Sequence, residues 1–186
     1  RLEVTNSDGS LIQYGGSGNE TLTGGEKDDH LDGRLGDDTV NGGAGNDTVY
    51  GDAGNDVLSG GTGNDILKGG MGSDTLKGDA GADELRGNKG NDTLTYDSAD
   101  TVINGGLGLD TLLIDTTVDL TGIDKLDGIE VLSLVNSTAN NLTLDIDDIL
   151  DWVADDALEI GSVADGKSKL VITGDSSDKI TLNGQD

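Results

Sequence analysis

The stretch that decides the fold is GGAGNDTVYGDAGNDVLSGGTGNDILK, which runs from Gly42 to Lys68. It holds three copies of one nine-residue unit, each with an aspartate at the sixth position and an aliphatic residue at the eighth. The same unit continues without insertion in both directions, so that successive units begin at every ninth residue from Gly15 to Gly105. Self-similarity at a fixed period predicts a repeat structure.

The eighth position predicts the core. Each unit divides into a six-residue glycine loop and a three-residue strand, in which the eighth side chain points to one face and its neighbours to the other. One aliphatic residue per unit cannot bury itself, but stacked units bury a column. Two units then form one 18-residue turn, and the turns build two parallel sheets. The column consists of Leu22, Leu31, Val40, Val49, Leu58, Leu67, Leu76, Leu85, Leu94, Ile103 and Leu112.

The sixth position predicts a cation. Stacked loops lie about 4.8 Å apart, so carboxylates 18 residues apart repel each other unless a cation lies between them. Calcium accepts six or more oxygen ligands in flexible geometry, whereas magnesium demands tighter geometry and zinc prefers His or Cys. The first unit has Glu20 at this position and the tenth has Thr101, so we expect an altered or missing site at the pair Asp83–Thr101. The other units carry Asp29, Asp38, Asp47, Asp56, Asp65, Asp74, Asp83, Asp92 and Asp110.

Composition supports the same interpretation. The 186 residues have a formal net charge of −26, only 2% aromatic residues, one histidine and no cysteine. A chain this acidic and this poor in large apolar side chains lacks a conventional core and favours cations over nucleic acid or anionic membranes. Residues 1–114 hold 21 acidic and 7 basic residues, a net of −14, so about seven divalent ions would neutralise them, and we expect about seven to eight calcium ions in all. We expect a monomer that binds no nucleic acid and inserts into no membrane.

The unit resembles the GGxGxDxUx repeat of the repeats-in-toxin (RTX) family, and the resemblance covers residues 15–113. It implies a right-handed parallel β-roll, all-β, in which calcium is held by the sixth-position carboxylates and by loop carbonyls. On the best site this implies Gly43, Gly45 and Asp47 of one loop, with Gly60, Thr62 and Asp65 of the loop two units on. The first two units depart from the pattern at Glu20 and Lys27. Across the repeats the implied carbonyl ligands are Gly33, Gly36, Gly42, Gly43, Gly45, Gly51, Gly54, Gly60, Gly61, Thr62, Gly63, Gly69, Gly70, Gly72, Gly78, Gly81, Gly87 and Gly90.

Two further regions flank the repeats. Residues 1–14 are predicted to be a lead-in strand, and residues 114–186 a β-rich cap. Alternating apolar stretches predict strands at TLLI, IEVLSLV, NLTLDI, KLVITG and DKITL. The segment DIDDILDWVADD predicts a short amphipathic helix that places Ile146, Ile149, Leu150 and Val153 on one face. We interpret its aspartates as a solvated face rather than a metal cluster, and Trp152 as a buried cap residue.

The run GIEVLSLVNSTANNLTLDIDDIL is similar to the segment that follows the repeats in very large adhesins secreted by bacterial type I machinery. This resemblance implies an extracellular or cell-surface protein whose secretion signal lies at or beyond this end. The N-terminus, RLEVTNSDGS, lacks the pattern of a signal peptide. Together the features predict a calcium-induced folding module of a type I-secreted adhesin, unfolded in the cytosol and folded outside.

Two other functions were weighed. The repeats could be the tail of a secreted protease or lipase, although the chain itself shows no catalytic motif and its single histidine, His30, is expected to point outward. A row of outward threonines could instead order water on ice. That row contains Thr21, Thr39, Val57, Thr75, Thr93 and Thr111.

Overall fold

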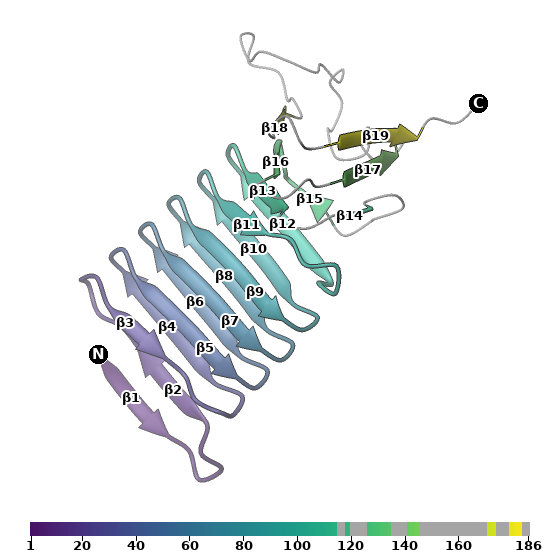
Figure 1. The fold of residues 1–186 in the computed structure, drawn as a ribbon. Helices are drawn as coiled ribbons and strands as arrows, with labels where there is room; N and C mark the ends of the chain where they lie inside the picture. Colours follow the sequence, from purple (N-terminus) through teal and green to yellow (C-terminus); the bar gives the residue numbers. More distant parts are fainter. Residues whose placement is uncertain (115–117, 120–125, 135–140, 146–170, 174–178, 184–186) are drawn as a thin grey trace.

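The computed structural model describes residues 1–114, 118–119, 126–134, 141–145, 171–173 and 179–183. Within these residues all regular structure is β-strand. Successive strands alternate between two eight-stranded sheets, and the strands stack into a solenoid along one axis (Figure 1). The predicted all-β roll with two parallel sheets is therefore confirmed.

The first sheet has the strand order β1-β2-β4-β6-β8-β10-β12-β15. Its first two strands pair antiparallel and every later pair is parallel, with neighbours in the repeat offset by 18 residues, as in Val49 opposite Leu67. The strands are β1 (Leu2–Thr5), β2 (Leu11–Tyr14), β4 (His30–Leu35), β6 (Thr48–Ala53), β8 (Ile66–Met71), β10 (Glu84–Lys89), β12 (Val102–Leu107) and β15 (Leu126–Asp127).

The second sheet has the order β18-β16-β13-β11-β9-β7-β5-β3, and the described pairs in it are parallel. It comprises β3 (Thr21–Thr23), β5 (Thr39–Ala44), β7 (Val57–Thr62), β9 (Thr75–Ala80), β11 (Thr93–Thr95), β13 (Thr111–Ile114), β16 (Val131–Leu134) and β18 (Val171–Thr173). A third sheet joins β14 (Val118–Asp119), β17 (Asn141–Asp145) and β19 (Lys179–Asn183). The five strands predicted after the repeats are thus present, whereas the predicted helix and Trp152 lie outside the described residues.

The core is the aliphatic column that the sequence predicts. Every eighth-position residue from Leu22 to Leu112 is at most 1% exposed, and Ile114, Ile129 and Leu132 extend the column toward the C-terminal end. Burying a Leu, Val or Ile side chain contributes roughly 1.5–3 kcal/mol. The column is only one residue wide per strand, so the loops at the edges of the sheets must also be stabilised.

The strands are longer than expected. The sequence predicts three-residue strands, but most strands in the repeat have six residues, because pairing resumes at the second and third positions of the next unit, as in Gly43 opposite Gly61. Glycine at the first position is buried within the strand, between these two sets of pairs. Each turn between strands is therefore only three residues long, and it contains the sixth-position carboxylate.

Candidate metal-binding loops

The sixth-position carboxylates form a continuous ladder along each edge of the roll. In each step, the backbone N–H of one aspartate donates to Oδ1 of the aspartate 18 residues later, as from Asp47 to Asp65 at 2.7 Å. The same bond recurs at 2.6–2.8 Å in the steps Glu20–Asp38, Asp29–Asp47, Asp38–Asp56, Asp56–Asp74, Asp65–Asp83, Asp74–Asp92 and Asp92–Asp110. The carboxylates that the sequence pairs are therefore stacked, and one oxygen of each is fixed by backbone.

The second carboxylate oxygen, Oδ2, is the unusual atom of the loop. In eight loops it is buried and has no hydrogen-bond partner, although each of these aspartates is at most 1% exposed. Burying an ionised carboxylate oxygen without a partner is costly. The eight are Asp38, Asp47, Asp56, Asp65, Asp74, Asp83, Asp92 and Asp110.

A backbone carbonyl points to the same place as the orphaned oxygen. A Cβ atom added to Gly42 would touch Oδ2 of Asp47, and it would lie 2.6 Å from the carbonyl oxygen of Gly60 in the loop two units on. The same arrangement recurs at Gly51, beside Asp56 and Gly69, and at Gly87, beside Asp92 and Gly105. Carboxylate and carbonyl oxygens thus converge in a cradle kept open by glycine, and this oxygen-only donor set fits a hard cation such as calcium.

Burial and mutual repulsion raise the pKa of several carboxylates in the ladder. Burial, with a further contribution from neighbouring carboxylates, raises the pKa of Asp47, Asp56 and Asp65 to about 6. It raises the pKa of Asp110 to about 6 and that of Asp74 to about 7. Backbone N–H donors oppose the rise but do not cancel it. Without a cation, the negative charge of these carboxylates is therefore not balanced by the groups around them.

The residues expected at the best site are brought together in part. Asp47 and Gly60 share the cradle, and Oδ1 of Asp65 contacts the backbone of Asp47. The carbonyls of Gly43 and Gly45 face the loop two units on, each lying where a Cβ on Gly61 or Gly63 would stand. Thr62, the last of the six residues expected at this site, differs, because its carbonyl accepts the N–H of Gly45 at 2.9 Å.

The two N-terminal loops are built differently. Oδ2 of Asp29 accepts the N–H of Gly25 at 2.6 Å, and Oε2 of Glu20 accepts the N–H of Gly16 at 2.8 Å. Oδ1 of Asp29 accepts the N–H of Leu11 at 2.6 Å. We call such loops closed and those with an orphaned Oδ2 open. In a closed loop a cation must compete with the loop's own N–H for the carboxylate.

The tenth unit is altered, as its sequence predicts. Thr101 replaces the aspartate, and Asp100, one position earlier and 3% exposed, accepts the N–H of Asp83 in a longer bond of 3.4 Å. Oδ2 of Asp100 accepts the N–H of Asp97 at 3.1 Å, so this loop is also closed. In addition, Tyr96 replaces the first-position glycine and is 6% exposed. The departure from glycine at position 96 was a signal that the sequence analysis did not use.

Position 2 of the unit distinguishes the two loop types. In all eight open loops this residue has a positive φ, for example 104° at Gly43 and 107° at Gly61. In the closed loops, Gly16, Gly25 and Asp97 do not have a positive φ, and their N–H groups point at the carboxylate. The sign of one dihedral angle therefore decides whether the carboxylate is satisfied by backbone or left for a cation.

A second ladder, at the fifth position, was missed by the sequence analysis. The side-chain oxygen of an Asn or Asp accepts the backbone N–H of the fifth residue two units later, as from Ser73 to Asn55 at 2.8 Å. Other acceptors are Asn19, Asp28, Asp37, Asn46, Asn64 and Asn91. The available signal was the recurrence of Asn or Asp at the fifth position, directly before the sixth-position carboxylate. This ladder runs opposite to the carboxylate ladder and ties the same loops together.

The other residues singled out in the sequence lie on the outer faces. His30 is on the first sheet, between the rings of Tyr14 and Tyr50, at centroid distances of 5.9 and 5.5 Å. The threonine row is in register on the second sheet. It is interrupted by Val57, and on the row beside it Lys77 forms an ion pair with Asp79.

In the part of the chain that the structure describes, no three His, Cys, Asp or Glu side chains gather into a metal cluster. Any cation in these loops must therefore take several of its ligands from backbone carbonyls. Among the same residues no helix is long and apolar enough to cross a membrane.

Comparison with known families agrees with this geometry. The model of the RTX calcium-binding nonapeptide repeat matches residues 14–49, 32–67, 41–76, 50–83, 68–102 and 78–113, which together span more than half of the chain. The fold and the loops together define a class of protein, the parallel β-solenoid whose glycine-rich loops bind calcium. The chain belongs to the RTX calcium-binding nonapeptide repeat family. A search of curated proteins found no match.

Proposed function

We propose that this RTX module folds when calcium fills its open loops, and that it serves a type I-secreted bacterial surface adhesin. The observation that carries the proposal is the set of eight buried carboxylate oxygens without a partner. In each open loop the orphaned Oδ2 and the first-position carbonyl of the loop two units on are the proposed ligand atoms at the cradle. The remaining proposed ligands are the second- and fourth-position carbonyls of the same loop, together with the third-position carbonyl and the sixth-position carboxylate of the loop two units on.

The same atoms explain why folding would depend on calcium. Without a cation, the folded ladder holds like charges one strand spacing apart, at about 4.8 Å, in loops that exclude water. Because the complete set of ligands exists only in the folded chain, binding and folding are one event. Each filled site stabilises the fold by RT ln(1 + [Ca]/Kd), about 2.7 kcal/mol when calcium is 100 times Kd.

This coupling suits secretion. In a cytosol with little free calcium the chain stays extended and can be threaded through a type I machinery. Outside the cell, abundant calcium folds the roll and opposes backsliding. The adhesin assignment is supported by the resemblance of residues 128–150 to the segment that follows the repeats in such adhesins. We propose a secreted or cell-surface location on the same ground.

The test is far-UV circular dichroism of the chain in EDTA, followed by titration with calcium and, separately, with magnesium. We expect little β signal in EDTA, a cooperative rise with calcium and little response to magnesium. A full β spectrum in EDTA would show that the aliphatic column suffices and would overturn the folding switch. To test secretion, the chain would be fused to a type I signal, and export of the wild type would be compared with that of a variant that folds without calcium.

A further inference from the structure

The outer face of the first sheet differs from that of the second. Among the described residues, six of the exposed large apolar side chains lie on strands of the first sheet, whereas Val57 alone lies on the second. The six are Leu2, Val4, Leu35, Ile66, Met71 and Leu107. Isolated apolar residues on a surface need no explanation, but their concentration on one of two equivalent faces indicates an interaction surface.

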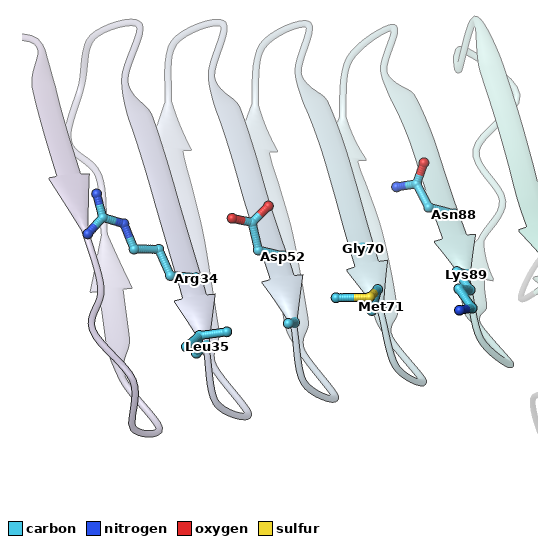
Figure 2. A pocket seen from close by; sticks show the side chains of 8 residues that line it. Arg34, Leu35, Asp52, Gly70, Met71, Asn88 and Lys89 are labelled. Carbon is cyan, nitrogen blue, oxygen red and sulfur yellow. The ribbon is translucent and has the colours of Figure 1, made fainter.

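A shallow groove of about 720 Å³ crosses the same face at the ends of β4, β6, β8 and β10. Figure 2 shows Asp52 and Asn88 projecting from strands on either side of Gly70, whose missing side chain leaves a gap between them. Met71, which is 57% exposed, extends from β8 toward β6, where Ala53 is its partner in the register. The face thus has both a protruding side chain and a hollow.

The residue types along the groove depart from the repeat, although its backbone does not. Arg34, Asp52 and Asn88 have φ values of 77°, 72° and 75°, at a position where other units use glycine. Residues with a Cβ rarely adopt this conformation, and it is unfavourable for them. In the open loops of the second sheet only Asp79 does so, and its carboxylate is held by Lys77 and Ser59. Side chains on this row of the first sheet are therefore retained despite an unfavourable backbone.

The charges of the face are divided between its two halves. On β4 and β6, Arg34 stands against Asp32 and Asp52, a net of −1. On β8 and β10, Lys68, Arg86 and Lys89 stand against Glu84, a net of +2. The four strands together have a net of +1 in a chain whose net charge is −26. This face is nearly balanced in charge, and its two halves are opposite in sign.

We propose that a second copy of this chain covers this face in a two-fold symmetric dimer. The two-fold axis runs parallel to the strands, between the facing first sheets of the two copies and midway between β6 and β8. It places β6 against β8 and β4 against β10 of the second copy, and it keeps each residue at its own level along the strand. The acidic half of each copy then faces the basic half of the other.

This symmetry sets complementary side chains opposite each other. Asp32 faces Arg86 of the second copy, which in its own chain forms an ion pair with Glu84 at 2.6 Å. His30 faces Glu84, and Tyr50 faces Lys68. Met71 faces the small Ala53, and Asp52 faces the gap at Gly70. Every contact occurs twice, as a two-fold interface requires.

The area is sufficient for a weak dimer. Six strands from β2 to β12, at a spacing of about 4.8 Å and about 3.3 Å per residue, present about 540 Å² per copy, since β2 has four residues and the others six. Two such faces bury about 1,080 Å², above the ~1,000 Å² expected of a biological interface and near its lower limit. The dimer rests on the proposed calcium binding, because two metal-free rolls would repel each other. The proposed dimer is an alternative to the monomer expected from the sequence.

Sedimentation equilibrium in excess calcium, with circular dichroism of the same samples, tests the dimer. We expect a mass that rises with concentration from 18.9 kDa toward twice that value, and a monomer in EDTA. Met71→Glu should abolish the rise, because it sets a carboxylate beside Asp52 of the second copy, whereas Val57→Glu, a similarly exposed site on the other sheet (49% against 57%), should leave it unchanged. A folded chain that stays monomeric in calcium, or that dissociates with Val57→Glu but not with Met71→Glu, would overturn the proposal.

The symmetry itself is tested by exchanging charges. Asp32→Arg alone sets two arginines against each other twice, and Arg86→Asp alone sets two aspartates against each other twice, so each variant should be monomeric. An equimolar mixture of the two should form a heterodimer, because every facing pair is then of opposite charge. Dimers of either single variant, or a mixture that stays monomeric while both variants are folded in calcium, would contradict the pairing of β4 with β10. Failure of calcium-induced folding would instead be visible by circular dichroism and would count against the folding proposal.

Discussion

Open and closed loops treat the carboxylate in opposite ways, and each closed loop departs from the repeat, at Glu20, Lys27 or Thr101. At Asp29 both oxygens accept backbone N–H groups, from Leu11 and Gly25. At Asp65 one oxygen accepts the N–H of Asp47 and the other has no partner. The difference lies in the residue at position 2, where Gly61 has a φ of 107° and Gly25 does not have a positive φ. A repeat can therefore keep its sixth-position aspartate and still satisfy it from its own backbone.

The largest expected effect is that of pH on the metal-free chain, because it acts on several open loops at once. Burial raises the pKa of Asp47, Asp56 and Asp65 to about 6 and that of Asp74 to about 7, above the value of an unfolded aspartate. The folded state then binds more protons than the unfolded state between pH ~4 and ~7, so its stability falls as pH rises through this window. In EDTA, β content should be higher at pH 5 than at pH 7.5. A metal-free β signal that does not change with pH would contradict the unpaired state of the open carboxylates.

Asp65→Asn should remove one open site. We expect a loss of about 2–3 kcal/mol in the free energy of unfolding at saturating calcium, and a higher calcium midpoint. The matched variant is Asp29→Asn in a closed loop, which loses one backbone hydrogen bond, about 1 kcal/mol, to a similar extent with and without calcium. Urea denaturation at several calcium concentrations measures both. Equal calcium dependence of the two losses would remove the distinction between the loop types.

Gly61→Ala and Gly25→Ala test the dihedral angle itself. At Gly61 the added Cβ meets the carbonyl oxygen of Gly43 and the backbone has a positive φ, so we expect a loss of roughly 1–3 kcal/mol and weaker calcium binding. At Gly25 the nearest atom is 3.8 Å away and φ is ordinary, so the change should stay within about 0.5 kcal/mol. Isothermal titration with calcium reports the affinity. A larger effect at Gly25 than at Gly61 would show that φ does not control the site.

The smallest expected effect is that of Asn55→Ala in the fifth-position ladder. Its side chain accepts the N–H of Ser73 at 2.8 Å on an exposed edge, and this bond does not involve the carboxylates. We expect a loss of about 1 kcal/mol that is independent of calcium. A calcium-dependent loss would show that the fifth-position ladder belongs to the metal site.

The nine-residue period and the aliphatic column were predictable because the side chains that define them can be placed in only one favourable way. An aliphatic residue at every ninth position must be buried, and carboxylates 18 residues apart must be stacked. The φ of position 2 was not predictable, since glycine adopts either sign with little cost and Gly25 and Gly61 look alike in the sequence. The six-residue strands were missed because the first-position glycines were assigned to the loop, although a buried glycine also permits pairing. The outer face of the first sheet was missed because only the outward row of the second sheet was compared at the 18-residue spacing.

The stacking of loops also has a mechanical consequence. The two ends of the roll lie at opposite ends of its axis (Figure 1), and each turn contacts only the turns next to it. A pulling force would therefore peel one 18-residue turn at a time, and each released turn would lengthen the chain by about 55 Å. Carboxylate and amide ladders that both join consecutive turns make every such step similar in strength. If the module serves an adhesin as proposed, it would lengthen in steps under load between a cell and the surface it holds, and calcium would set the force at which it yields.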